Sequence, residues 1–129
     1  MLNLAALEHP FDYTIEVLTE AGAHAQTVDL VETFNWLYGL HVQRLETWRN
    51  PQDERKYRVV KARNRDDRRV LVLWRDMANL DPVVERKFLE VKLKDEAPFD
   101  EMLINGDAAT PGFGSLDALF KQLMEEGET

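Results

Sequence analysis

The chain has 129 residues and no cysteine, and 44% of its residues are hydrophobic while 31% are charged. This composition is that of one folded globular domain, and it excludes a disulfide scaffold, a thiolate metal site and a cysteine nucleophile. No apolar run reaches the roughly 18 residues that a membrane-spanning helix needs, so we expect a cytoplasmic protein. The net charge of −8 argues against a dedicated nucleic-acid-binding protein.

Charge is unevenly distributed along the chain. Residues 1–43 contain six acidic residues and no Lys or Arg, residues 44–75 contain eleven Lys or Arg and five acidic residues, and residues 76–129 contain five and thirteen. The three segments therefore carry net charges of −6, +6 and −8. The basic middle segment is typical of a solvated, charged hairpin, and it also suits a contact with phosphate groups or a partner. Both interpretations stay open.

One helix is predicted in the acidic first segment. Asp29, followed three residues later by Glu32, is typical of a helix start with a side-chain cap, and Gly39 is typical of a helix end. Apolar side chains recur along this helix with helical spacing, at Leu30, Val31, Phe34, Leu37 and Tyr38. We therefore predict that Phe34 lies in the core.

Five strands are predicted from alternating or continuous apolar patterns. Residues 12–18 alternate with period two, and residues 21–24 after them predict a turn. Further strands are expected over residues 41–48, 57–62, 70–74 and 99–104. Residues 70–74 are apolar without interruption, which predicts a central strand that is covered on both faces.

Two more helices follow the basic segment. Asp81 and Pro82 predict a helix start, because aspartate caps the first turn and proline suits its first position. The expected buried face of this helix consists of Val84, Phe88 and Val91. Ser115 predicts the start of a last helix, whose apolar face consists of Leu116, Leu119, Phe120 and Leu123.

These elements predict an α+β fold in one domain that spans residues 1–129. Its order is strand, helix, three strands, helix, strand, helix. The short turns predict an antiparallel meander, and the helical connection predicts a parallel fifth strand. We expect a mixed, mainly antiparallel five-stranded sheet with about three helices packed on it.

No catalytic or metal-binding residue is predicted. His9, His24 and His41 lie in three different segments and lack the spacing of a helical metal pair. Ser115 is the only serine, and it lacks the glycine pattern of a nucleophile turn. Its role as a helix cap accounts for it.

The order of helix, three strands, helix and strand over residues 29–104 resembles the core of restriction-type nucleases. Those enzymes hold Mg²⁺ with an acid on the second core strand and a Glu-x-Lys sequence on the third. Here residues 70–75 read Val-Leu-Val-Leu-Trp-Arg, without a carboxylate. We expect no active metal nuclease, and a degenerate relative of that core stays open as an alternative.

The helix that begins after Asp29 is unusually rich in aromatic residues. Asn35 and Trp36 lie off its apolar stripe. A packed core helix explains most of the pattern, but a tryptophan in an exposed apolar patch is typical of a partner contact. Asn35 and Trp36 are therefore candidates for a partner interface.

Three blocks of sequence resemble one family. They are Glu-Thr-Phe-Asn-Trp-Leu-Tyr-Gly-Leu over 32–40, Val-Leu-Trp-Arg-Asp over 72–76, and Leu-Ile-Asn-Gly-Asp over 103–107, followed by Ser-Leu-Asp-Ala-Leu-Phe over 115–120. Together they resemble the C-terminal region of bacterial site-specific DNA methyltransferases, the adenine-N6 type related to modification subunits of type III restriction systems. The resemblance extends from about residue 8 to residue 126. It implies that the chain is an accessory C-terminal domain of a larger methyltransferase.

The catalytic motifs of that family are missing. The family needs an Asp/Asn-Pro-Pro-Tyr/Phe loop for the flipped adenine and a glycine-rich turn after a strand for S-adenosylmethionine. Residues 81–84 lack the second proline and the aromatic residue, and residues 112–115 follow no predicted strand. The resemblance therefore implies S-adenosylmethionine for the parent enzyme, whereas we expect no cofactor and no methyl transfer in this chain alone.

Two roles for such a domain stay open beside the nuclease-like alternative. The first is DNA contact through clustered cations. The second is packing on the catalytic domain or a restriction subunit without DNA contact. The acidic flanks favour the second role because they repel phosphate. The candidate DNA-binding residues of the first role are Arg55, Lys56, Arg58, Lys61, Arg63, Arg65, Arg68 and Arg69.

Overall fold

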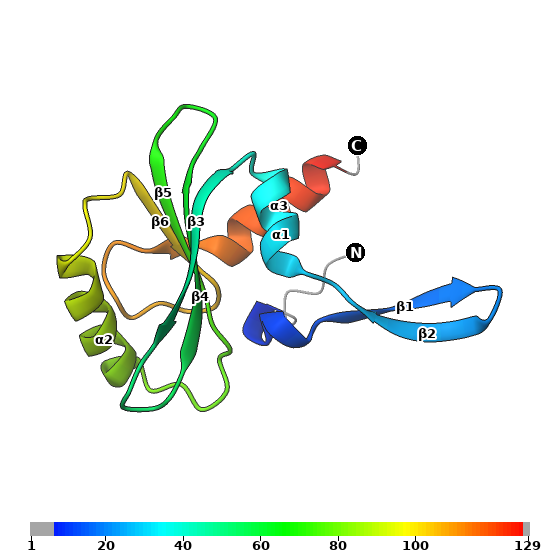
Figure 1. Cartoon of the computed structure of the whole chain (residues 1–129), viewed down its shortest axis with the longest axis horizontal. Helices are drawn as coiled ribbons and strands as arrows, with labels where there is room; N and C mark the ends of the chain where they lie inside the picture. Colours follow the sequence, from blue (N-terminus) through cyan, green and yellow to red (C-terminus); the bar gives the residue numbers. More distant parts are fainter. Residues whose placement is uncertain (1–6, 128–129) are drawn as a thin grey trace.

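A computed structural model describes residues 7–127, and for residues 15–17, 27 and 127 it describes the backbone alone. A five-stranded sheet forms the body, with α1 and α3 on one face and α2 on the other, and a two-stranded arm projects from it (Figure 1). None of the described helices is long and apolar enough to cross a membrane. The elements in chain order are η2 (Pro10–Asp12), β1 (Thr14–Thr19), β2 (Gly22–Thr27), α1 (Leu30–Leu37), β3 (His41–Arg49), β4 (Lys56–Arg63), β5 (Arg69–Trp74), α2 (Pro82–Lys94), β6 (Glu101–Ile104), β7 (Gly114–Ser115) and α3 (Leu116–Gly127).

The body has the predicted α+β architecture. Its strand order is β3-β4-β5-β6-β7. Strands β3, β4 and β5 form an antiparallel meander, whereas β5, β6 and β7 run parallel. Helix α2 makes the crossover between β5 and β6, as parallel neighbours require. Strand β5 is central, and residues 70–74 are fully buried, which confirms the prediction for this strand.

Helix α1 begins and ends where the sequence predicts. The Asp29 side chain accepts a hydrogen bond from the backbone N–H of Glu32 at 3.0 Å. Gly39 follows the helix with a φ of 69°, in the left-handed region that glycine adopts without strain. Phe34 is fully buried, which confirms that it belongs to the core.

Two hydrophobic cores lie on opposite faces of the sheet. Between the sheet, α1 and α3, the rings of Phe34, Trp74 and Phe120 pack with centroids 5.4–6.2 Å apart. Between the sheet and α2, Tyr57 and Leu89 are fully buried. The alternating side chains of β4 supply both cores, because successive residues of a strand point to opposite faces.

The N-terminal hairpin differs from the predicted sheet. Strand β1 pairs with β2, which the sequence predicts only as a turn, and neither belongs to the five-stranded sheet. The fifth strand is instead the two-residue β7. Strand β2 contains Gly22, Ala23 and Ala25, residue types with low strand propensity, so its pairing with β1 decides its conformation. The side chains of residues 15–17, which include part of the predicted apolar face, lie outside the described atoms.

Helix α2 is rotated relative to the predicted face. Leu89 and Glu85 are its buried residues, whereas the prediction for Val91 is wrong because its side chain is 63% exposed. Arg75, a buried arginine directly after β5, binds Glu85 and so brings that side of the helix inward.

Candidate functional site

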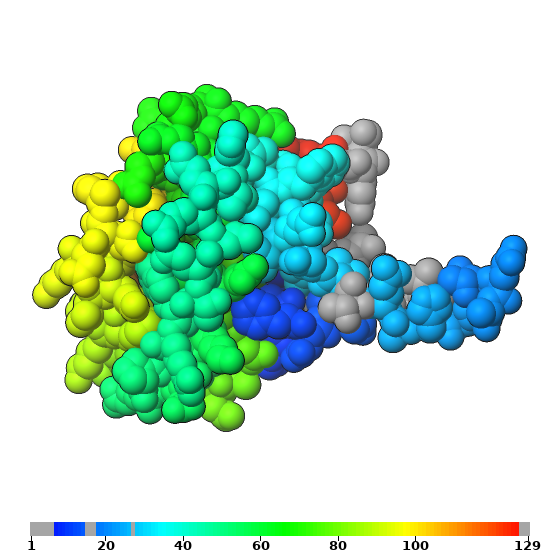
Figure 2. Space-filling model, in the orientation of Figure 1, coloured from blue at the N-terminus to red at the C-terminus, as the bar shows by residue number. Residues whose placement is uncertain are grey.

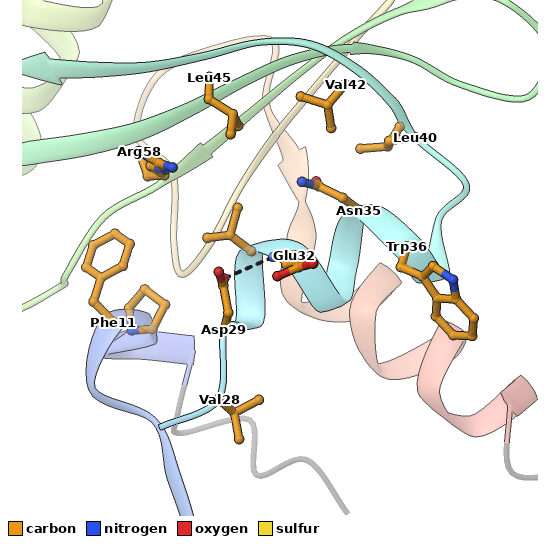
Figure 3. Close-up of a pocket in the computed structure, with 12 residues that line it drawn as sticks. Phe11, Val28, Asp29, Glu32, Asn35, Trp36, Leu40, Val42, Leu45 and Arg58 are labelled. Carbon is orange, nitrogen blue, oxygen red and sulfur yellow. Dashed lines mark hydrogen bonds between the residues drawn. The ribbon is translucent and has the colours of Figure 1, made fainter. Parts of the chain in front are cut away.

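An apolar groove of about 700 Å³ lies between α1, β3 and η2 (Figure 3). Val42 and Leu45 point from β3 towards α1, and Phe11 of η2 lies at one end. Phe11, Leu45 and Trp36, three of the large apolar side chains that are exposed, line this groove. Its apolar lining suits a protein segment better than a phosphate backbone.

The two residues predicted for a partner interface both line this groove. Trp36 is 78% exposed and lies at the end of the groove opposite Phe11 (Figure 3). The amide oxygen of Asn35 is buried and accepts no hydrogen bond from the described part of the chain. An exposed tryptophan beside an apolar groove is the feature that interfaces use as an anchor.

Charged residues at the groove come from both walls. Asp29 is committed to capping α1. The carboxylate of Glu32 on α1 and the guanidinium of Arg58 on β4 line the groove, and neither makes a hydrogen bond or ion pair within residues 7–127. An occupant of the groove would therefore meet one free negative and one free positive group.

Four of the eight candidate DNA-binding residues are engaged inside the molecule. Arg55 pairs with Asp53 and donates to the backbone oxygens of residues 76 and 78. Arg63 donates to the backbone oxygen of residue 67 at 2.8 Å. Arg69 donates to the backbone oxygen of residue 98 at 2.7 Å and lies over the Phe99 ring. These interactions hold the cations in structural roles.

Lys61 is the fourth engaged cation. Its Nζ lies 2.9 Å from Glu46 Oε2 and 2.6 Å from Glu96 Oε1. Burial opposes the charge of the lysine, but the two carboxylates outweigh burial and raise the pKa of Lys61. In return, the hydrogen bond from Lys61 lowers the pKa of Glu46. Both groups are thus held in their charged forms.

The other four cations do not form one patch. Lys56 and Arg58 lie on the α1 face near the start of β4, whereas Arg65 and Arg68 lie in the turn between β4 and β5. Six residues of strand and turn lie between Arg58 and Arg65, a distance of roughly 20 Å along the chain. Arg65 packs over Gly39, where its charge suits the carboxyl end of α1.

The structure contains the nuclease-like order of elements without the nuclease residues. Helix α1, the meander β3-β4-β5, helix α2 and the parallel strand β6 follow in the order that the sequence suggests. Neither β4 nor β5 contains an acidic residue. Among residues 7–127, no group of three His, Cys, Asp or Glu side chains lies close enough to hold a metal ion.

A buried ion pair that the sequence analysis does not single out connects the sheet to α2. The Arg75 Nε and Nη2 donate to Glu85 at 2.7 and 2.8 Å, and both side chains are fully buried. The Tyr57 hydroxyl also donates to Glu85 at 2.8 Å. Burial is the main cause that raises the pKa of Tyr57, and the negative charge of Glu85 raises it further. The only signal in the sequence is an arginine that directly follows five apolar residues.

Asn105 extends this buried network to the start of the described chain. Its side-chain oxygen accepts from the Arg75 backbone N–H at 2.8 Å, and its amide nitrogen donates to the backbone oxygen of Leu7 at 2.6 Å. Arg75 Nη2 also donates to the backbone oxygen of Asp107 at 2.7 Å. The network is enclosed, so its geometry indicates a structural role.

Comparisons of the chain with protein-family models, curated proteins and solved structures found no match.

Proposed function

We propose that this chain is a non-catalytic domain that docks on a protein partner through the groove between α1 and β3. The exposed Trp36 at the end of an apolar groove is the observation that carries the proposal. Following the resemblance to adenine-N6 DNA methyltransferases, the partner would be the catalytic domain of such an enzyme or a restriction subunit. S-adenosylmethionine would then be bound by the parent enzyme and not by this chain.

Packing on a protein is favoured over DNA contact by the charges. Half of the candidate cations are engaged with acids or backbone oxygens. The groove is lined by two carboxylates, of Asp29 and Glu32, and by one guanidinium, of Arg58, so its net negative charge would repel phosphate. The net charge of −8 acts in the same direction.

The test of docking is binding of this chain to the methyltransferase polypeptide that its reading frame or operon encodes, measured by calorimetry. Replacing Trp36 by alanine should weaken binding about 30-fold, which corresponds to about 2 kcal/mol for an anchor residue. Val83→Ala is the matched control, because Val83 is an exposed apolar residue on α2, across the sheet. Equal affinities for Trp36→Ala and the unchanged chain, or a reading frame and operon without a methyltransferase, would contradict the proposal.

DNA contact is the second candidate, because the side chains of Arg65 and Arg68 make no hydrogen bond or ion pair with the described residues. If these two arginines neutralise phosphates, a plot of the logarithm of the DNA-binding constant against the logarithm of the salt concentration should have a slope of about −2. The double variant Arg65→Ala with Arg68→Ala should lose this salt dependence. Binding should weaken equally for all DNA sequences. Unchanged DNA binding by the double variant would show that the turn between β4 and β5 does not contact DNA.

The nuclease-like alternative rests on the observed strand order. In that interpretation the chain is a free-standing structural domain that has the core of a restriction-type nuclease but no metal site. Its docking groove would then serve a partner other than a methyltransferase. Calorimetry with the encoded methyltransferase separates the interpretations, because a free-standing domain should not bind to that enzyme.

A further inference from the structure

Strand β3 is the long open edge of the sheet. It has nine residues, and among the strands of residues 7–127 it pairs with β4 alone. The opposite edge, β7, has two residues. In Figure 2 the teal residues of β3 lie on the front surface with no other element over them. Among residues 7–127, no hydrogen bond from another segment reaches the outer backbone edge of residues 41–49. Such an edge offers a row of free N–H and C=O groups to an added strand.

The charged side chains at the middle of β3 are complementary to those of a second copy of the same strand. Arg44 and Glu46 lie on the same face of the strand and flank Leu45, which points to the other face. Arg44 is 73% exposed, and its Nε lies 3.3 Å from Glu46 Oε2. If a second β3 pairs antiparallel about Leu45, each Arg44 lies directly opposite Glu46 of the second copy. Opposite charges in such cross-strand positions stabilise a sheet.

We infer that the occupant of this edge is a second copy of the chain, which pairs β3 with β3 about a two-fold axis at Leu45. The two sheets then form one continuous sheet of ten strands. Leu45, which is 51% exposed, meets Leu45 of the second copy on the α1 face. This interface is isologous, so it closes on itself and builds no filament.

Charge selects this register over its neighbours. Centring the pair on Arg44 would put two arginines opposite each other, and centring it on Glu46 would do the same with two glutamates. Sliding one β3 strand by a single residue along the other is excluded, because a side chain on the α1 face of one copy would then lie beside a side chain on the α2 face of the second copy. Centring on Thr47 avoids like charges but forms neither ion pair. The bulge between Val42 and Arg44 adds a further obstacle to unspecific pairing.

The inference goes beyond the proposed function. Pairing uses the backbone edge of β3, the face that carries Arg44, and Leu45, which also lines the groove. The anchor of partner docking, Trp36 on α1, takes no part in the pairing. The Trp36→Ala variant should therefore still dimerise. Loss of partner binding with retained dimers, or the reverse, separates the two proposals.

Crosslinking tests the register directly, because the chain contains no cysteine. Leu45→Cys should oxidise to a covalent dimer of twice the 15.0 kDa chain mass, since directly opposed residues lie within disulfide reach. Thr47→Cys is the matched control on the same face of the same strand and should stay unlinked. A crosslink through residue 47 and not 45, or no crosslink through either, would overturn the inference.

Charge exchange tests the ion pairs. Arg44→Glu should raise the dimer dissociation constant about tenfold in sedimentation equilibrium, because it opposes two pairs of glutamates. Glu46→Arg should do the same, and mixing the two variants should restore dimers, since every pair then joins opposite charges. Glu46→Arg also removes one of the two carboxylates that bind Lys61. If that variant misfolds, the Arg44→Glu result and the crosslink test the inference without it. Unchanged association of Arg44→Glu, or a monomeric unchanged chain, would contradict the inference.

Discussion

Replacing Glu85 by glutamine tests how much the buried ion pair contributes to the stability of the fold. The Glu85 carboxylate accepts three hydrogen bonds, two from Arg75 and one from Tyr57. Glutamine keeps the shape but removes the charge and turns one acceptor into a donor. The Arg75 guanidinium then stays buried without a counter-charge, and one of its nitrogens, Nη1, already has no hydrogen-bond partner among the described residues.

The expected cost follows from burial. Removing one partner of a buried pair costs about 3–5 kcal/mol, because the remaining charge is uncompensated. For a domain of this size the midpoint of thermal unfolding should fall by about 10–20 °C. Tyr57→Phe removes one hydrogen bond and leaves the ion pair, so it should cost about 1–3 kcal/mol.

Urea unfolding followed by circular dichroism measures both effects, and Glu90→Gln is the matched control. Glu90 lies on the same helix and accepts from Arg86 Nε at 3.0 Å, but that pair is about half exposed. The control should change the free energy of unfolding by less than about 0.5 kcal/mol. If Glu85→Gln costs no more than Glu90→Gln, the enclosed network does not hold α2 on the sheet and the reasoning from burial fails.

Three further predictions concern the core and helix α1. Phe34→Ala should lower the free energy of unfolding by about 3–5 kcal/mol and Leu73→Ala by about 2–5 kcal/mol, and unchanged denaturant midpoints would show that these buried side chains pack loosely. Gly39→Ala should destabilise by about 1 kcal/mol or more, because φ is positive and a Cβ would meet the Arg65 side chain; a small gain in stability would mean that the helix end can rearrange. Burial and the hydrogen bond to a carboxylate raise the pKa of Tyr38 from 10.0 to about 12, so the folded protein keeps this proton longer than the unfolded chain. The stabilisation is therefore complete below pH 10.0 and is lost as the pH rises towards about 12, and Tyr38→Phe should flatten that loss in stability curves measured at alkaline pH.

Local chemistry determined most of the elements of this protein. Asp29 and Gly39 mark the ends of α1, because a cap and a left-handed residue act within one turn of the helix. Asp81 marks the start of α2 in the same way. The uninterrupted apolar run at 70–74 placed β5 at the centre of the sheet, because no other position covers both faces of such a strand. These signals need only neighbours in sequence, so the sequence alone contains them.

The tertiary structure decided what depends on distant partners. Gly22 and Ala25 lie in a strand only because β1 supplies the backbone hydrogen bonds. The rotation of α2 depends on Arg75, which lies ten residues before Glu85 and draws it into the core. Periodicity of apolar residues cannot predict that a glutamate is buried and Val91 is exposed.

The same distinction applies to the candidate site. The sequence by itself identified Asn35 and Trp36 as residues outside the apolar stripe, and it located the cations in one basic segment. Only the tertiary structure brought Phe11 and Leu45 beside Trp36 to form a groove. It also divided the cations between internal pairs and free side chains, because strand alternation and the positions of Glu46 and Glu96 decide which cation finds an acid. Burial and pairing are properties of contacts between distant residues, and a single sequence specifies them only through the completed fold.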